Sequence, residues 1–205
     1  EPFGNVVLLD SGEKDIEKYS ELFQDDKPKI IGINPAIIEW KFPIDVVKNI
    51  KNLKGVSTRS SWAFYLDLDY FKSNHIAVTN IAGANSQSVA EYAIWMMLCL
   101  AKKLAIQSKG EKVFDQVSVQ TEIAEKLAGI VGLGKIGSRV ANMCKGLGMK
   151  VVYWSPNSRN DELKYANLTD LLKNSDFVFN CIELRDETKG FFDKEKLSLL
   201  RSDAY

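Results

Sequence analysis

The sequence contains very little histidine and cysteine: one histidine, His75, and three cysteines in 205 residues. A single histidine excludes a metal site built from several histidines, and it leaves one candidate for any mechanism that needs a histidine as acid or base. The cysteines, Cys99, Cys144 and Cys181, form no CxxC pair. We therefore expect no metal site, and we interpret these residues as reduced, buried thiols of a cytoplasmic protein.

Net charge and long hydrophobic runs are also absent. Lysine plus arginine and aspartate plus glutamate each number 27, so the formal net charge is zero, which disfavours nucleic acid as a partner. The longest nearly apolar run, 92–101, is about half of the roughly 20 residues that span a bilayer, so we expect a buried helix there and no membrane partner. The first residues, 1–4, have neither a basic segment nor an apolar stretch, so no export signal is expected.

Short apolar runs alternate with helical patterns along the first half of the chain. Strands are expected at 6–9, 29–33, 53–58 and 76–80, and helices at 15–23 and 45–50. Continuous apolar strands separated by helices are typical of a parallel sheet covered on both faces. A long helix is expected over 88–104, because Ser88 with Glu91 three residues later fits a capping box. Its apolar middle predicts burial between layers or subunits.

The second half of the chain restarts the alternation after a polar stretch, 107–125, which we interpret as the crossover between two domains. Strands are expected at 127–131, 150–154 and 176–181, and helices at 135–147, 168–174 and 193–200. The predicted fold class is α/β, with one domain over 1–104 that includes the long helix, and a second domain over 105–205.

A glycine-rich loop, Gly132-Leu133-Gly134-Lys135-Ile136-Gly137, lies directly between an expected strand and an expected helix. In a GxGxxG loop that binds a dinucleotide, the first glycine allows a tight turn and the second lets the backbone approach a pyrophosphate. The third lets the helix pack closely on the strand. Backbone N–H groups at the helix start, at Lys135 and Ile136, would face the phosphates. The alternative is a turn without a ligand, but the strand and helix on either side favour dinucleotide binding.

The end of the next strand indicates the cofactor. An acidic residue about 20 positions past the loop usually holds the ribose hydroxyl of NAD. Here that position is Ser155, and Arg159 follows nearby. Without a carboxylate a 2′-phosphate is not repelled, and an arginine can bind it, so NADP is slightly favoured over NAD. The alternative is that Arg159 is a solvated turn residue.

Four patterns occur in order along nearly the whole chain: 66–68 with 75–80, 82–85 with 88–91, the glycine loop, and 168–172 with 187–192. Together they resemble the D-isomer-specific 2-hydroxyacid dehydrogenases. The resemblance implies a flavodoxin-like substrate domain and the first half of a Rossmann-type, doubly wound NAD(P)-binding domain. It also implies a homodimer supported by the long helix. We further assign Cys181 and Thr188 to the cofactor site.

The resemblance implies an oxidoreductase that transfers a hydride between the nicotinamide of NADP or NAD and a 2-hydroxy or 2-oxo acid. The family's catalytic arginine, acid and histidine would lie beyond Tyr205, so we expect these 205 residues alone to be inactive. His75 stands where the family usually has glycine, and we interpret it as a turn residue; Arg201 is expected at the surface. Two alternatives stay open: a non-catalytic NAD(P)-binding regulator or corepressor-like protein, and a structural remnant held together by dimer packing.

The expected substrate loop departs from the family pattern. Trp62 stands at the place of a usual glycine, and Phe64 at that of a frequent aspartate. The loop could still bind the substrate through Ser60, Ser61 and Trp62, with aromatic walls for a larger or more apolar acid. Equally, Trp62 and Phe64 could simply pack.

Overall fold

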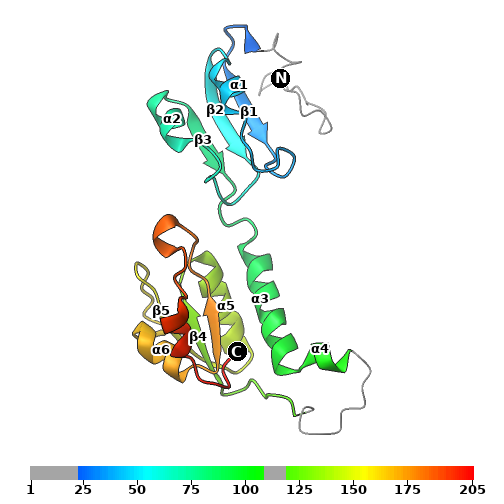
Figure 1. Cartoon of the computed structure of the whole chain (residues 1–205), viewed down its shortest axis with the longest axis vertical. Helices are drawn as coiled ribbons and strands as arrows, with labels where there is room; N and C mark the ends of the chain where they lie inside the picture. Colours follow the sequence, from blue (N-terminus) through cyan, green and yellow to red (C-terminus); the bar gives the residue numbers. More distant parts are fainter. Residues whose placement is uncertain (1–22, 109–118) are drawn as a thin grey trace. The chain divides into compact units, whose positions relative to one another are not determined.

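The computed structural model describes residues 23–108 and 119–205, and the chain divides into two compact units, Glu1–Ala84 (unit 1) and Asn85–Tyr205 (unit 2) (Figure 1). The expected strand 6–9 and nearly all of the expected helix 15–23 lie outside the described residues. Both units are built on parallel sheets, as the alternation of strands and helices predicted. None of the helices in the described ranges is long and apolar enough to cross a membrane.

Unit 1 contains a parallel sheet in the order β1-β2-β3. Its strands and helices are β1 (Lys29–Ile33), α1 (Ile44–Lys48), β2 (Leu53–Thr58), α2 (Leu68–Ser73) and β3 (Ala77–Asn80). The core gathers Val47 of α1, Val56 of β2 and the fully buried Phe71 of α2. Burial of these apolar side chains fixes which face of each helix turns inward.

Helix α2 was not predicted from the sequence. It begins at a cap in which the Asp67 carboxylate accepts a hydrogen bond from the Tyr70 N–H at 2.9 Å, and it is only six residues long. A helix this short spans too few residues to show a clear helical period. It ends in an exposed turn where His75 has a φ of +56°, which confirms the interpretation of His75 as a turn residue.

Unit 2 contains a parallel sheet in the order β6-β5-β4-β7. Its strands are β4 (Leu127–Val131), β5 (Lys150–Trp154), β6 (Lys164–Tyr165) and β7 (Phe177–Asn180). Its helices are α3 (Ser86–Ala101), α4 (Leu104–Gln107), α5 (Lys135–Gly146), α6 (Leu168–Asn174), the 3-10 helix η3 (Asp186–Thr188) and α7 (Lys194–Ser198). The two-residue strand β6 was not predicted.

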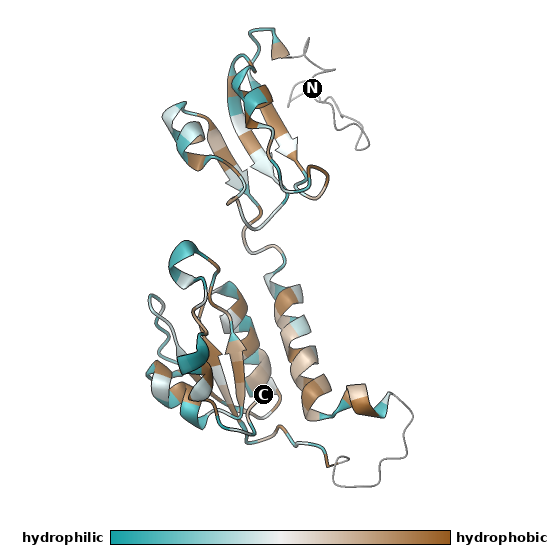
Figure 2. Ribbon diagram, viewed as in Figure 1, coloured by the Kyte–Doolittle hydropathy of each residue, from teal (hydrophilic) through white to brown (hydrophobic). Residues whose placement is uncertain are grey.

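Apolar residues cover both faces of the unit 2 sheet, and Figure 2 shows the apolar character of its strands. Along β4, Ala128 and Ile130 join the cluster formed with α3 and α5, whereas Val131 joins a second cluster with Leu171 of α6. Neighbouring residues of a strand point to opposite faces, so the two clusters lie on opposite sides of the sheet. This arrangement agrees with the predicted doubly wound architecture.

Helix α3 differs from the prediction in its start, its end and its burial. It ends at Ala101 rather than at Leu104, because Lys103 is left-handed, with a φ of +52°, and separates it from α4. It begins at Ser86 rather than after Ser88, because Ser86 is buried, and Glu91 accepts a hydrogen bond from Gln87 at 2.7 Å instead of closing a capping box. Ala90, Ile94, Met97 and Ala101 are buried, and the opposite face is exposed within this chain.

The unit boundary also differs from the predicted one. The sequence analysis placed the long helix with the first domain and ended that domain at residue 104. In the structure the buried face of α3 joins the cluster that contains Val140, Ala141 and Cys144 of α5, so α3 belongs to unit 2 and the units divide after Ala84.

Candidate functional site

The strand order of unit 2 reverses at β4. The chain passes from β4 through α5 to β5 on one side, and later through α6 to β7 on the other side of β4. In open parallel α/β sheets, ligands bind outside the carboxyl ends of the strands at such a switch point. The glycine loop 132–137 follows β4 at this position, and Figure 1 shows it between β4 and the start of α5.

Gly132 makes the turn that leaves β4. It has a φ of +97°, a conformation that favours glycine, and its N–H donates to the carbonyl oxygen of Trp154 at 2.8 Å. A Cβ at this position would lie 2.9 Å from the carbonyl group of Cys181 and the nitrogen of Ile182. The segment after β7 therefore passes directly beside the turn, and only glycine fits there.

Gly134 and Gly137 meet different surroundings. A Cβ at Gly137 would lie 2.0 Å from the carbonyl oxygen of Gly132, so α5 packs against the turn at a distance that excludes any side chain. A Cβ at Gly134 would meet no heavy atom within 4 Å. Gly134 caps the twelve-residue α5, so the open space lies at the end of a helix where N–H groups and the dipole attract an anion.

Ser155 and Arg159 lie together at the end of β5. Ser155 is buried, and its hydroxyl oxygen accepts a hydrogen bond from the Ser158 N–H at 3.3 Å. The Arg159 Nη1 donates to the carbonyl oxygens of Ser155 and Ser158, each at 2.9 Å, and the guanidinium lies 5.0 Å from the ring centre of Tyr165. Among the described residues no carboxylate forms an ion pair with Arg159, which is exposed. A cation is thus held in position beside the expected ribose position.

The structure brings Cys181 to the glycine turn, and it joins the Thr188 hydroxyl to the loop that contains η3. The Cys181 N–H donates to Val131 at 2.8 Å, and burial raises the pKa of its thiol to about 11. The Thr188 hydroxyl accepts from the Arg185 N–H at 2.8 Å and lies 2.6 Å from the Glu183 carbonyl oxygen. Thr188 therefore shapes the loop that contains η3.

The expected substrate residues lie after β2 in unit 1. Ser60 is buried, and its hydroxyl donates to the carbonyl oxygen of Trp62 and lies 3.2 Å from Thr58 Oγ1. The carbonyl oxygen of Ser61 accepts from Asn80 Nδ2 at 3.3 Å. Trp62 is 52% exposed, so its ring does not lie in the core of the unit.

Two further aromatic residues, Tyr65 of the same loop and Trp40 of the loop after β1, contact Phe64 and were not singled out from the sequence. Trp40 stacks on Phe64 with ring centres 6.1 Å apart, and its ring meets that of Tyr65 edge-on at 5.5 Å. Trp62 contacts the same Phe64 ring at 6.0 Å. The signal that could have found this cluster is the parallel pairing of β1 with β2, which brings the ends of both strands, Ile33 and Thr58, side by side.

Arg201 is committed to ion pairs rather than to an open site. Its Nε and Nη2 donate to the Asp203 carboxylate at 3.0 and 2.8 Å, and its Nη1 donates to Asp176 at 3.0 Å. The described residues contain no group of three or more histidine, cysteine, aspartate or glutamate side chains that could hold a metal ion.

The family model described as "D-isomer specific 2-hydroxyacid dehydrogenase, NAD binding domain" matches residues 94–205, more than half of the chain. The hydroxypyruvate reductase of Thermotoga maritima is 28% identical over 198 residues, which cover 92% of this chain and 65% of that protein.

Solved structures give the same result. The D-lactate dehydrogenase of Aquifex aeolicus, complexed with NAD and lactic acid, has a TM-score of 0.75 and 30% identity, covering 91% of this chain and 56% of that one. The NAD-dependent formate dehydrogenase of Staphylococcus aureus, in complex with NAD, has a TM-score of 0.74 and 26% identity, covering 98% and 60%. The chain spans less than two thirds of the length of each of these relatives.

Proposed function

Because the chain belongs to the D-isomer-specific 2-hydroxyacid dehydrogenase family, we propose that it forms part of a cytoplasmic NAD(P)-dependent oxidoreductase acting on a 2-hydroxy or 2-oxo acid. The observation that supports this most strongly is the glycine turn at the switch point of the unit 2 sheet. There Gly132 turns the chain with a positive φ, and the open space at Gly134 lies at the N-terminal end of α5, where a pyrophosphate can approach the backbone.

The residues at the carboxyl end of the unit 2 sheet fit a dinucleotide. Gly132, Gly134 and Gly137 shape the phosphate loop, and the N–H groups at Lys135 and Ile136 begin α5, where the helix dipole favours negative charge. The half-buried Cys181 lines the turn from the side of β7. When bound, the nicotinamide would supply the hydride acceptor or donor, and the protein's part is to position it.

The preferred cofactor under this proposal is NADP, with NAD as the alternative that both solved relatives hold. Support comes from the missing carboxylate at Ser155 and from the exposed Arg159, which two backbone carbonyls and Tyr165 hold in place. Replacing Arg159 with glutamine should weaken NADPH binding about tenfold and leave NADH binding unchanged, because only the 2′-phosphate loses a charged donor.

Calorimetric titration of the chain with both nucleotides measures this difference. The matched control is Arg139→Gln, which removes an exposed arginine of α5 that is bonded to Gln87 at 2.6 Å. Tighter binding of NADH than of NADPH by the unaltered chain would reject the preference, and an equal loss for both nucleotides in Arg159→Gln would give Arg159 a general role.

Under this proposal Ser60, Ser61 and Trp62 of unit 1 bind the acid substrate.

No candidate for the family's catalytic groups is suitably placed in the described residues. His75 lies exposed in the turn between α2 and β3, and Arg201 is ion-paired. The 205 residues should therefore bind cofactor without oxidising or reducing an acid. Turnover that depends on Gly134 in an absorbance assay at the nicotinamide wavelength would contradict this.

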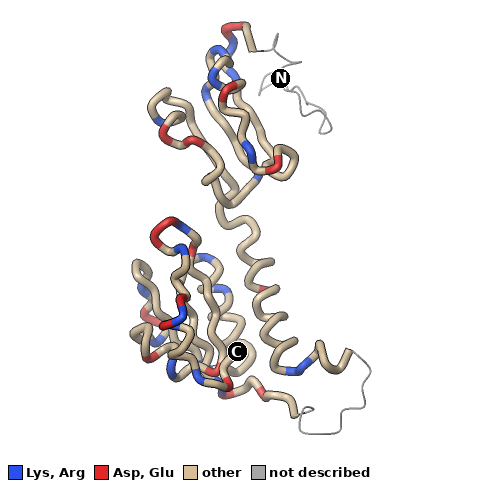
Figure 3. Tube along the Cα trace, viewed as in Figure 1, with Lys and Arg blue, Asp and Glu red and all other residues tan. Residues whose placement is uncertain are grey.

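Homodimer formation through the exposed face of α3 is the proposed assembly. Tyr92, Trp95, Met96 and Leu100 form an exposed apolar strip, and Glu91 is the one charged residue of α3. Figure 3 shows that most of this helix carries no charge. Exposed apolar strips of this kind mark interfaces. Sedimentation should therefore report a dimer for the unaltered chain and a monomer for Trp95→Glu; a stable monomer in both would reject it.

A further inference from the structure

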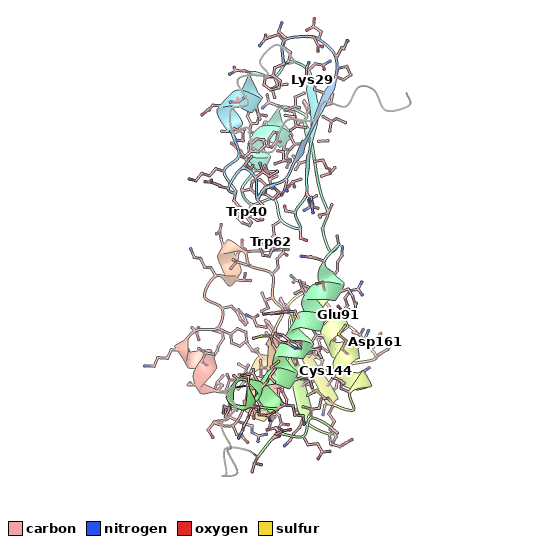
Figure 4. The ribbon with its side chains drawn as sticks, turned by 90° about the vertical axis from the view of Figure 1, so that its right-hand side faces the viewer. Lys29, Trp40, Trp62, Glu91, Cys144 and Asp161 are labelled. Atoms are coloured by element: carbon pink, nitrogen blue, oxygen red, sulfur yellow. The ribbon has the colours of Figure 1, made fainter. Side chains whose placement is uncertain are left out.

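Four aromatic side chains meet at the carboxyl end of the unit 1 sheet. Trp40 comes from the loop after β1, and Trp62, Phe64 and Tyr65 come from the loop after β2. We call these four residues the aromatic platform. Trp40, Trp62 and Phe64 are 44%, 52% and 72% exposed, so three of the rings present large surfaces to solvent. Figure 4 shows Trp40 and Trp62 at the same end of unit 1, far from Lys29 at the start of β1.

The backbone beneath the platform is strained in one place. Glu39 and Trp40 have φ values of +50° and +60°, a left-handed conformation that side chains other than glycine and asparagine rarely adopt. Strained residues of this kind persist only where the surrounding structure holds them, and they concentrate at functional sites. Trp40 is held by its parallel stacking on Phe64 and its edge-on contact with Tyr65.

Hydrogen bonds of three hydroxyl groups, those of Thr58, Ser60 and Tyr65, hold the platform in place. Tyr65 is hydrogen-bonded to Thr58 Oγ1, which lies 3.2 Å from the buried Ser60 hydroxyl, and that hydroxyl in turn donates to the Trp62 carbonyl oxygen. Both ends of the aromatic loop are therefore tied to the last residue of β2. Rings held in this way lose little freedom when a flat ligand group stacks on them.

Charged residues of both signs flank the rings. Arg59 follows the last residue of β2, and Glu39 and Lys41 stand on either side of Trp40. The rings rather than the charges therefore select the ligand, and the group that they select is planar and apolar. Ligands of parallel α/β sheets bind at the carboxyl strand ends, where this platform lies. Exposed aromatic rings at this end of the sheet can bury an apolar side chain of a substrate.

We propose that the aromatic platform binds the aromatic side chain of the acid substrate, so that the substrate class is a 2-hydroxy or 2-oxo acid with an aryl group. This inference rests on the proposed function, in which the substrate is a 2-hydroxy or 2-oxo acid whose C2 carbon is oxidised or reduced. The platform adds selectivity for the ring by stacking, and the reaction itself is unchanged.

The test compares two ligands that share the carboxylate and the hydroxyl and differ in the ring. The chain is titrated calorimetrically with D-3-phenyllactate and with D-lactate, in the presence and absence of NADPH. Phenyllactate should bind at least about tenfold more tightly. Trp62→Ala and Phe64→Ala should each remove most of that preference, and Phe64→Ala should leave the affinity for lactate unchanged. Both side chains are largely exposed, so the variants should fold, and circular dichroism checks this.

The matched control is Leu197→Ala, which removes an apolar side chain of similar exposure, 51%, from α7 in unit 2 and should change neither affinity. Equal binding of the two acids, or an unchanged preference in both platform variants, would overturn the inference. So would a change in sedimentation without a change in acid affinity, because the platform would then be a contact between proteins. NADPH binding without ring preference rejects this inference alone, whereas a lack of NADPH binding rejects the proposed function.

Discussion

The two parallel sheets end in opposite kinds of surface at their carboxyl ends. In unit 2 the loop after the central strand consists of glycines, and its chemistry belongs to backbone N–H groups around Gly134. In unit 1 the corresponding loops present large rings, and their chemistry belongs to side chains such as Trp62. The backbone site suits a phosphate group whose structure does not vary, whereas the side-chain site can vary with the acid that is bound.

The same contrast appears in a pair of turns that lead from a helix to a strand. In unit 2 the turn from α5 to β5 contains Gly148 with a φ of +78°, and in unit 1 the turn from α2 to β3 contains His75 with a φ of +56°. Glycine adopts this conformation without steric cost, whereas histidine adopts it only at a steric cost. Among the described residues, unit 1 has further left-handed residues at Glu39, Trp40 and Asn52, and unit 2 has two, Lys103 and Glu125, so the contrast between glycine and a strained residue belongs to this pair of turns.

The largest effect is expected where a backbone contact excludes every side chain. Gly137→Ala would place a Cβ 2.0 Å from the Gly132 carbonyl oxygen, so α5 must move away from the turn. We expect unit 2 to lose about 3 kcal/mol of stability and the thermal midpoint to fall by about 10 °C. Circular dichroism during heating measures this. The control, Gly146→Ala, has no atom within 4 Å of the new Cβ and should not destabilise the protein.

The next effect concerns the thiols packed into unit 2. Burial, with a smaller contribution from Cys181, raises the pKa of Cys144 to about 12, and burial raises that of Cys181 to about 11. Both groups stay protonated at pH 8, and the thiolate is the reactive form. Iodoacetamide should therefore modify them about a hundredfold more slowly in the folded chain than in urea. Peptide mass mapping against time measures both rates, and equal rates would show that the β7 end is open.

The smallest effect is expected from making the unit 1 turn resemble the unit 2 turn. His75→Gly removes the left-handed strain but adds freedom to the unfolded chain, so we expect a gain of about 0.5 kcal/mol. His75→Ala keeps the strain and should give no gain. Chemical unfolding of both variants measures the difference. A clear loss of stability in His75→Gly would mean that the imidazole makes a contact beyond the turn.

The sequence best predicted those helices, strands and turns that depend on neighbouring residues alone. The bounds of β2, β4, β5 and α6 agree with the predictions, because apolar runs and a capping residue such as Asn167 define them without distant contacts. The glycine loop was predicted for the same reason, since its spacing reflects steric limits within six residues. Helix α3 was misplaced at its start because the burial of Ser86, a tertiary effect, extended it beyond the local capping pattern.

The aromatic platform shows what local patterns could not give. Trp40 and Phe64 are 24 residues apart in the sequence, and their stacking depends on β1 and β2 ending side by side. Trp62 and Phe64 could be noted as unusual at their positions, but whether they pack inside or face solvent depends on the fold. The left-handed backbone at Trp40 has no sequence signal, because tryptophan is not a residue that favours it.

The central claim is that the open space at Gly134 belongs to a dinucleotide. Gly134→Val fills that space, and because no protein atom lies within 4 Å of the new Cβ, the fold should survive unchanged by circular dichroism. Quenching of tryptophan fluorescence on titration with NADPH measures binding. We expect saturable binding by the unaltered chain and none by Gly134→Val. Equal affinity of the two folded proteins would show that the loop is only a turn and would contradict the account.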